Sequence, residues 1–113
     1  MSRDRERIRI LNDQMRVAGP TPGDQALWLT TRGVDQLGPA VLAAAVQRVR
    51  TFDHFDGDND PYGEHDFGSF ELNGERLFWK IDYYDLSMTQ GSPDPADEAA
   101  TRRVLTIMLA LEY

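Results

Sequence analysis

Residues 67–84 read FGSFELNGERLFWKIDYY, and this stretch decides the fold. Two runs rich in aromatic and branched side chains flank Asn73-Gly74. That dipeptide is favoured in a two-residue type I′ turn, because both of its residues must adopt positive φ. The stretch therefore predicts a β-hairpin.

The two-residue turn also predicts which residues face each other across the hairpin. It pairs Phe70 with Leu77, an apolar pair, and Gly68 with Trp79, which sets an aromatic ring over a residue without a side chain. Alternate residues of a strand point to opposite faces. We expect the core face to carry Phe70, Leu72, Leu77, Trp79, Ile81 and Tyr83. The other face then carries Glu71, Arg76, Lys80 and Asp82.

The elements before the hairpin follow from periodicity and from Gly and Pro. A helix from Arg3 to Ala18 is predicted by an apolar face at Ile8, Leu11, Met15 and Ala18. Residues 26–31 have the composition of a strand. Gly38-Pro39 favours the start of a second helix, and residues 53–66, which have no apolar period, predict a long ordered loop.

After the hairpin, Asp94-Pro95 is typical of a helix start. An apolar stripe at Ala100, Val104, Ile107, Met108 and Leu111 predicts a C-terminal helix. The expected order is α-β-α-β-β-α. This order indicates a single small α+β domain over residues 1–113. The domain has two layers, in which helices pack on an antiparallel sheet.

Charge is unevenly distributed along the chain. The 113 residues contain 12 Lys plus Arg and 19 Asp plus Glu, a net charge of −7. Residues 51–66 contain six acidic residues and no Lys or Arg. Such a surface repels nucleic acid, whose binding depends on Lys and Arg. It would attract the basic groove of a protein that itself binds nucleic acid.

The candidate partner-binding residues lie in this acidic segment and at the end of the hairpin. Exposed aromatic side chains beside carboxylates would supply the hot spots of such an interface. The set is Asp56, Asp58, Asp60, Tyr62, Glu64, His65, Asp82, Tyr84 and Asp85. No catalytic residue and no cofactor is expected, and a homodimer is a further possibility, in which the Arg-rich first helix meets the acidic half of a second copy.

A metal site in a small metal-dependent hydrolase, built from residues 54–66, is the alternative. Asp56, Asp58 and Asp60 alternate as the first ligands of an EF-hand do, but Pro61 and Phe67 occupy the positions of its Gly and Glu. A looser site for a hard cation would use Asp58, Asp60, Glu64 and His65. The competing interpretation is a loop whose Asp and Asn side chains bind their own backbone.

His65 has two interpretations as well. It could act as a general base oriented by a carboxylate such as Asp82 or Asp85, or it could simply hold the loop in place. No Ser lies in a Gly-x-Ser-x-Gly elbow, and no Gly-rich loop ends in Lys-Ser or Lys-Thr. The usual motifs of a serine hydrolase and of a phosphate-binding loop are therefore missing.

Composition also bears on the cellular setting. The chain has no Cys, so disulfides and thiolate zinc sites are excluded. Its first seven residues are highly charged, and its longest apolar run, residues 40–46, is too short to span a membrane. We expect a cytoplasmic protein.

Three motifs resemble a family of small bacterial proteins catalogued as domain of unknown function 3768. They are DNDPYGEHDFG at residues 58–68, FWKIDYYD at 78–85 and GSPDP at 91–95. The resemblance covers roughly residues 6–113. It implies cytosolic proteins, often encoded on plasmids and prophages, with no established enzymatic activity and no defined catalytic residue.

The leading hypothesis joins the charge and the resemblance. It is a non-enzymatic acidic module that binds the basic surface of a nucleic-acid-binding protein. By analogy with small anti-CRISPR proteins, the mobile-element setting suggests an inhibitor of a defence complex.

Overall fold

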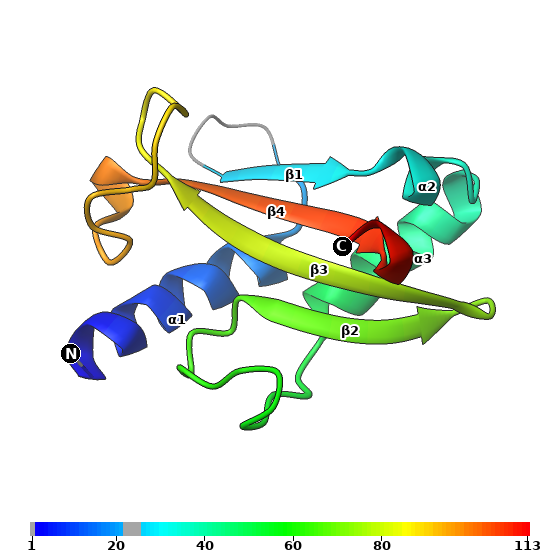
Figure 1. Ribbon diagram of the computed structural model, residues 1–113, viewed down its shortest axis with the longest axis horizontal. Coiled ribbons are helices and arrows are strands. Elements are labelled where there is room, and N and C mark those ends of the chain that lie inside the picture. Colours follow the sequence, from blue (N-terminus) through cyan, green and yellow to red (C-terminus); the bar gives the residue numbers. More distant parts are fainter. Residues whose placement is uncertain (1, 22–25) are drawn as a thin grey trace.

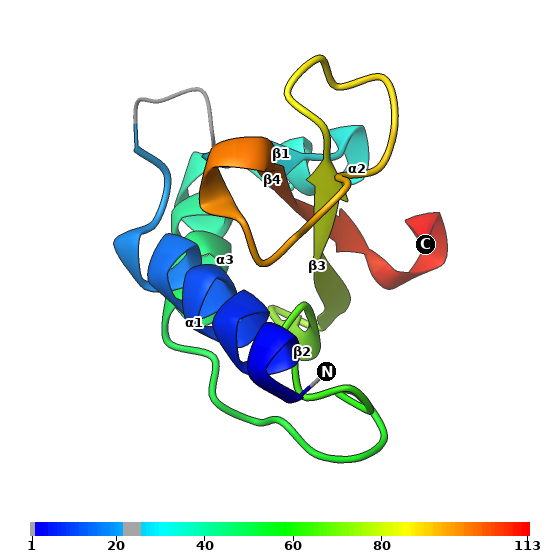
Figure 2. The ribbon, with the colours of Figure 1, turned by 90° about the vertical axis from the view of Figure 1, so that its left-hand side faces the viewer.

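The fold is a four-stranded mixed sheet with helices against one face. The computed structural model describes the backbone of residues 2–21 and 26–113, and the side chains of all of these except residues 2 and 3. Strand order is β1-β4-β3-β2, and α1 and α3 lie on the same side of the sheet (Figures 1 and 2). The elements are α1 (Ser2–Ala18), β1 (Ala26–Thr30), α2 (Arg32–Asp35), α3 (Pro39–Arg50), β2 (Phe67–Leu72), β3 (Glu75–Tyr84), η1 (Glu98–Ala100), β4 (Arg102–Leu109) and η2 (Ala110–Glu112).

The hairpin and its register are confirmed. β2 and β3 pair antiparallel, with Phe70 opposite Leu77 and Gly68 opposite Trp79. The turn residue Asn73 has φ 52°. The side chains of Leu77 and Trp79 are fully buried, so the expected core face is the one that meets the helices.

The two predicted helices before the hairpin are also present. Ile8, Leu11 and Met15 of α1 are buried, whereas Ala18, at the end of the predicted stripe, is exposed. The second helix begins at Pro39, as predicted. Its buried residues Ala45 and Val49 join the core beneath the sheet.

The predicted C-terminal helix is wrong, because residues 102–109 form β4 in the middle of the sheet. β4 pairs antiparallel with β3 and parallel with β1, so the sheet is mixed and not purely antiparallel. Leu105 and Ile107 are fully buried, and Val104 and Met108 are each 4% exposed. A strand buried on both faces loses the alternation that distinguishes it from a buried helix.

The segment before β4 has a local explanation. Asp97 accepts a hydrogen bond from the amide of Ala99 at 3.0 Å, and this contact begins the single turn of η1. Residues 94–98 have the composition of a helix start, but the helix that follows them is the single turn of η1. The element order differs from the prediction at this point, while the α+β class stands.

Neither α1 nor α3 lies on the second face of the sheet (Figure 2). Side chains on that face border an open groove of about 450 Å³ that includes Leu29, Lys80, Tyr84 and Met108. Among the residues that the structure describes, no helix combines the length and the apolar character needed to cross a bilayer.

Candidate functional site

Residues 53–66, which we call the acidic loop, connect α3 to β2 and run beside α1 (Figure 1). Asp56 Oδ1 accepts from the amides of Asp58 (2.9 Å) and Asn59 (3.1 Å), and Asn59 Oδ1 accepts from the amide of Asp56 (2.9 Å). These two backbone donors hold the pKa of Asp56 below its usual value. The tip of the loop is thus ordered by its own Asp and Asn side chains.

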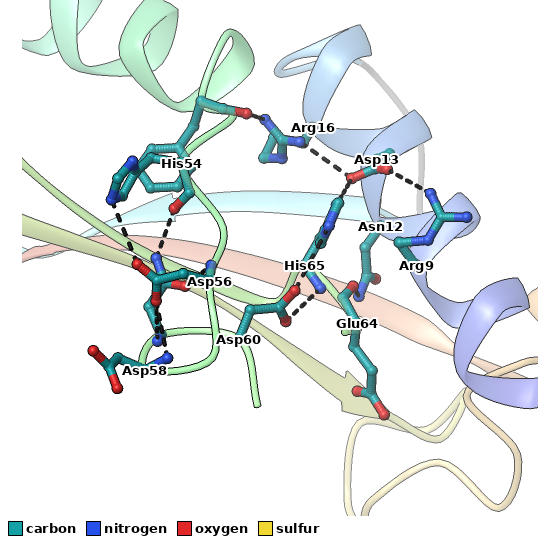
Figure 3. Close-up of polar contacts among 12 residues, drawn as sticks. Arg9, Asn12, Asp13, Arg16, His54, Asp56, Asp58, Asp60, Glu64 and His65 are labelled. Carbon is teal, nitrogen blue, oxygen red and sulfur yellow. Dashed lines mark hydrogen bonds and ion pairs between the residues drawn. The ribbon is translucent and has the colours of Figure 1, made fainter. Parts of the chain in front are cut away.

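His65 fastens the loop to α1. Its Nδ1 lies 2.9 Å from Asp13 Oδ1 and its Nε2 lies 3.6 Å from Asp60 Oδ2 (Figure 3). Its ring also stacks on that of Phe55, with centroids 3.8 Å apart. The His65 amide also donates to Asp60 Oδ1 at 3.0 Å. Asp60 is only 9% exposed, so its carboxylate supports the loop from inside.

Asp82 and Asp85, the carboxylates expected to orient His65, contact other groups. Asp82 pairs with Lys80, while Asp85 accepts from Thr89 and Ser87 within its own turn. The Thr89 amide is the main cause of the lowered pKa of Asp85. The carboxylates that face the imidazole are instead those of Asp13, at Nδ1, and Asp60, at Nε2.

Asn12 ties α1 to the other end of the loop and to the sheet. Its Nδ2 donates to the carbonyl of Glu64 (3.0 Å) and to Tyr83 Oη (2.8 Å), and its Oδ1 accepts from Arg103 Nε (2.8 Å). Tyr83 Oη in turn donates to Glu64 Oε1 at 3.0 Å. Burial is the main cause of both the raised pKa of Tyr83 and the lowered pKa of Arg103.

Arg16 joins the same helix to the start of the loop. Its Nη1 donates to the carbonyls of Val49 (3.0 Å) and Phe52 (2.6 Å), and its Nη2 lies 3.1 Å from Asp13 Oδ1. The guanidinium also lies 5.3 Å from the centroid of the Phe55 ring. The buried Arg16 guanidinium therefore hydrogen-bonds carbonyl groups at the end of α3 and orients Asp13, which contacts His65.

The structure does not gather the four residues of the alternative metal site. Only Asp60 and His65 meet, whereas Asp58 is exposed at the tip and Glu64 accepts from Tyr83 (Figure 3). Within residues 4–21 and 26–113, no group of three or more His, Cys, Asp or Glu side chains could hold a metal ion.

The outer side of the acidic loop carries exposed carboxylates. Asp53, Asp56 and Asp58 are exposed, and no described Lys or Arg forms an ion pair with them. Tyr62 is 63% exposed, with the Arg5 guanidinium 5.1 Å from its ring centroid. The loop thus has a fastened inner side and an acidic outer side that also presents an aromatic ring.

Comparison with known proteins identifies the family. A sequence model described as "Protein of unknown function (DUF3768)" matches residues 30–112. The chain belongs to this family. The DUF3768 match contains the acidic loop, the hairpin and β4, and confirms the resemblance inferred from the three motifs. No curated protein and no solved structure matches the chain.

The nine candidate partner-binding residues of this DUF3768 protein fall on two surfaces. Asp56, Asp58 and Tyr62 lie outward on the acidic loop, and Asp60, Glu64 and His65 lie behind them as supports. The remaining three belong to the far end of β3. Of these, Asp82 and Tyr84 border the groove on the open face, and Asp85 lies in the turn after β3.

The residues that sequence reasoning missed come mainly from α1, outside the DUF3768 match. Asn12 and Arg16 are four and eight positions after the buried Ile8, so they lie on the inner stripe of the helix. A polar residue on an otherwise apolar stripe could have identified Asn12 and Arg16, because buried polar groups need hydrogen-bond partners. Arg103, only 4% exposed within β4, is the same kind of signal.

Proposed function

We propose that this DUF3768 protein is a non-enzymatic binding module whose acidic loop docks on the basic, nucleic-acid-binding surface of a partner protein. The observation that carries the proposal is the two-sided construction of the loop. Asp53, Asp56 and Asp58 face solvent, while His65 and Asp60 fasten the inner side.

The fastening supports binding because it removes an entropic cost. A loop that is already ordered loses less conformational freedom when a partner engages it. Two kinds of contact order this loop before binding: the backbone turn around Asp56 and the His65 contacts to α1. Its carboxylates are presented at fixed positions.

Charge and chemistry support the same class of partner. A net charge of −7 speeds encounter with a basic surface and disfavours nucleic acid itself. Tyr62 offers the type of side chain that dominates interface energies. His65 Nδ1 is hydrogen-bonded to Asp13 and Nε2 faces the Asp60 carboxylate, and these contacts favour a structural role for the imidazole.

A nucleic-acid-binding defence complex is the partner class that we propose within this function. Its basic groove normally receives phosphates, and an ordered array of carboxylates would compete for the same Lys and Arg side chains. The protein would then act as an inhibitor by mimicking the charge of nucleic acid.

The test compares capture of partners from the native host by the wild type and by the variant Asp53→Asn, Asp56→Asn and Asp58→Asn. These changes remove three exposed charges and leave the His65 contacts in place, and the side-chain amide oxygen of Asn at position 56 can still accept from the backbone amides of residues 58 and 59. We expect the wild type to capture a nucleic-acid-binding protein, with binding that weakens as salt rises and that duplex DNA or RNA displaces. The variant should lose most of this binding.

A matched control removes three exposed charges elsewhere, as Asp94→Asn, Asp97→Asn and Glu98→Gln. It should bind as the wild type does. Association that ignores salt, or that both triple variants retain equally, would refute docking through the acidic loop.

A further inference from the structure

β1 forms the border of the sheet (Figure 1). Among the residues that the structure describes, β4 is the one strand that pairs with it, so its other edge is unpaired there. Its five residues read ALWLT, with no charge and no proline. Proteins usually place charged residues or proline on an exposed edge, because an edge without them is a template for another strand.

The hydrogen bonding of β1 decides which backbone groups are free. The amide of Thr31 donates to the carbonyl of Ile107 at 3.1 Å, so residue 31 turns its backbone toward β4. Backbone groups alternate sides along a strand. Those that point away from β4 belong to Ala26, Trp28 and Thr30, and no described backbone group elsewhere bonds to them.

The opposite edge of the sheet, at β2, is protected in the usual way. Arg48 Nη1 donates to the outward carbonyl of Glu71 at 3.0 Å, and the Glu71 carboxylate pairs with Arg76 at 3.1 Å. A charged, capped edge resists the addition of a strand. The contrast singles out β1 as the edge that is built to pair.

We propose that two copies of this chain pair β1 with β1, antiparallel about a twofold axis at Trp28, and join two four-stranded sheets into one. The sequence itself indicates that the pairing strand is β1 of a second copy, because Ala-Leu-Trp-Leu-Thr reads nearly the same in both directions about Trp28. In this register Trp28 meets its own copy as a hydrogen-bonded pair, and Leu27 lies opposite Leu29 of the second copy.

The burial and the charge of β1 also agree with pairing to a second copy of the chain. Leu29 is 50% exposed in the monomer, and pairing would cover it with Leu27 of the other chain. The strand has no charge of its own, and the Asp35 carboxylate that contacts it accepts from the hydroxyl of Thr30 at the end of the strand. A five-residue strand buries less area than a standard interface, so we expect a dissociation constant of roughly micromolar order.

The first test is sedimentation across a concentration series. The wild type should shift from the 12.8 kDa monomer to twice that mass as concentration rises. Leu29→Lys should weaken the dimer roughly tenfold, because it places a charge opposite Leu27 twice per dimer. The control Val17→Lys, at a 57% exposed apolar position on α1, should leave the dimer unchanged.

The second test fixes the register and does not depend on a destabilising variant. The chain has no Cys, so engineered thiols are the only ones present. A mixture of Leu27→Cys and Leu29→Cys chains should form an intermolecular disulfide, since these positions lie opposite each other. Leu29→Cys alone should not, because its two copies are offset along the strands. A monomer at all concentrations, a dimer that Leu29→Lys leaves intact, or equal cross-linking of Leu29→Cys alone would overturn the proposal.

Discussion

A single imidazole decides how the acidic loop is held. His65 adopts a φ of 56° and contacts two carboxylates and an aromatic ring, which together outweigh the strain of that backbone conformation. One of the two interpretations from the sequence is that His65 holds the loop, but the sequence does not identify Asp13 as its partner. The two residues are 52 positions apart, and only the packing of α1 brings them together.

Replacing His65 should therefore loosen the loop. His65→Asn keeps a residue type that tolerates positive φ, and it removes the contacts to Asp13 and the stack on Phe55. We expect a loss of about 1–3 kcal/mol in the free energy of unfolding, measured by urea denaturation, because the buried Asp60 loses a partner. Loop amides should exchange faster with deuterium. His54→Asn is the control, since the side chain of His54 is 83% exposed; equal effects of the two variants would contradict the anchoring role.

Asp66 gives a prediction about pH. Burial, and then the nearby Glu64 carboxylate, raise the pKa of Asp66 above its ordinary value. A raised carboxyl pKa means that the folded state binds the proton more tightly, so its ionisation destabilises the fold as pH rises through the folded pKa. Asp66→Asn should stabilise the protein at pH 7 by about a few tenths of a kcal/mol, after solvent screening.

The gain from Asp66→Asn should vanish below the unfolded pKa, where the wild-type carboxyl is neutral in both states. Urea denaturation at pH 7 and near pH 3 measures this difference. A gain that is as large at low pH would mean that packing, and not charge, is responsible.

At the scale of elements, the hairpin and β4 show what local sequence can and cannot specify. The Asn73-Gly74 turn sets its register through residues that are neighbours in the chain, so the pairing of Gly68 with Trp79 was predictable. β4 takes its identity from two strands distant in sequence and is buried on both faces. Its apolar run fits a helix equally well, and only the whole sheet decides between them.

The Gly68 position tests the hairpin packing. A Cβ there would clash with Nε1 of the buried Trp79 and would lie 2.8 Å from Cζ of Phe52, which packs against the core. Gly68→Ala should cost about 1–3 kcal/mol through overpacking, and should lower the melting temperature by roughly 4–8 °C per kcal/mol. Gly57→Ala, where a Cβ meets nothing within 4 Å, should change the melting temperature little. Equal melting temperatures for the two variants would show that the ring of Trp79 moves freely.

Across the whole molecule, α1 supplies both the core and the support of the site. Its apolar side chains meet the sheet, and its polar residues Asn12, Asp13 and Arg16 hold the acidic loop, β4 and the end of α3. The family match begins at residue 30, yet the groups inside that match depend on this helix. Fold and candidate site therefore share one scaffold.

The last prediction concerns that dependence. Ile8, Leu11 and Met15 are 7%, 3% and 8% exposed, and burying each contributes about 1.5–3 kcal/mol. Their sum is comparable with the whole stability of a typical domain, about 5–15 kcal/mol. A chain that starts at Ala26 should therefore lack a cooperative thermal transition by circular dichroism, and a peptide of residues 1–21 added in excess should restore it. A sharp transition near the wild-type temperature without the peptide would show that the sheet and α3 suffice, and that the contacts of α1 are peripheral to folding.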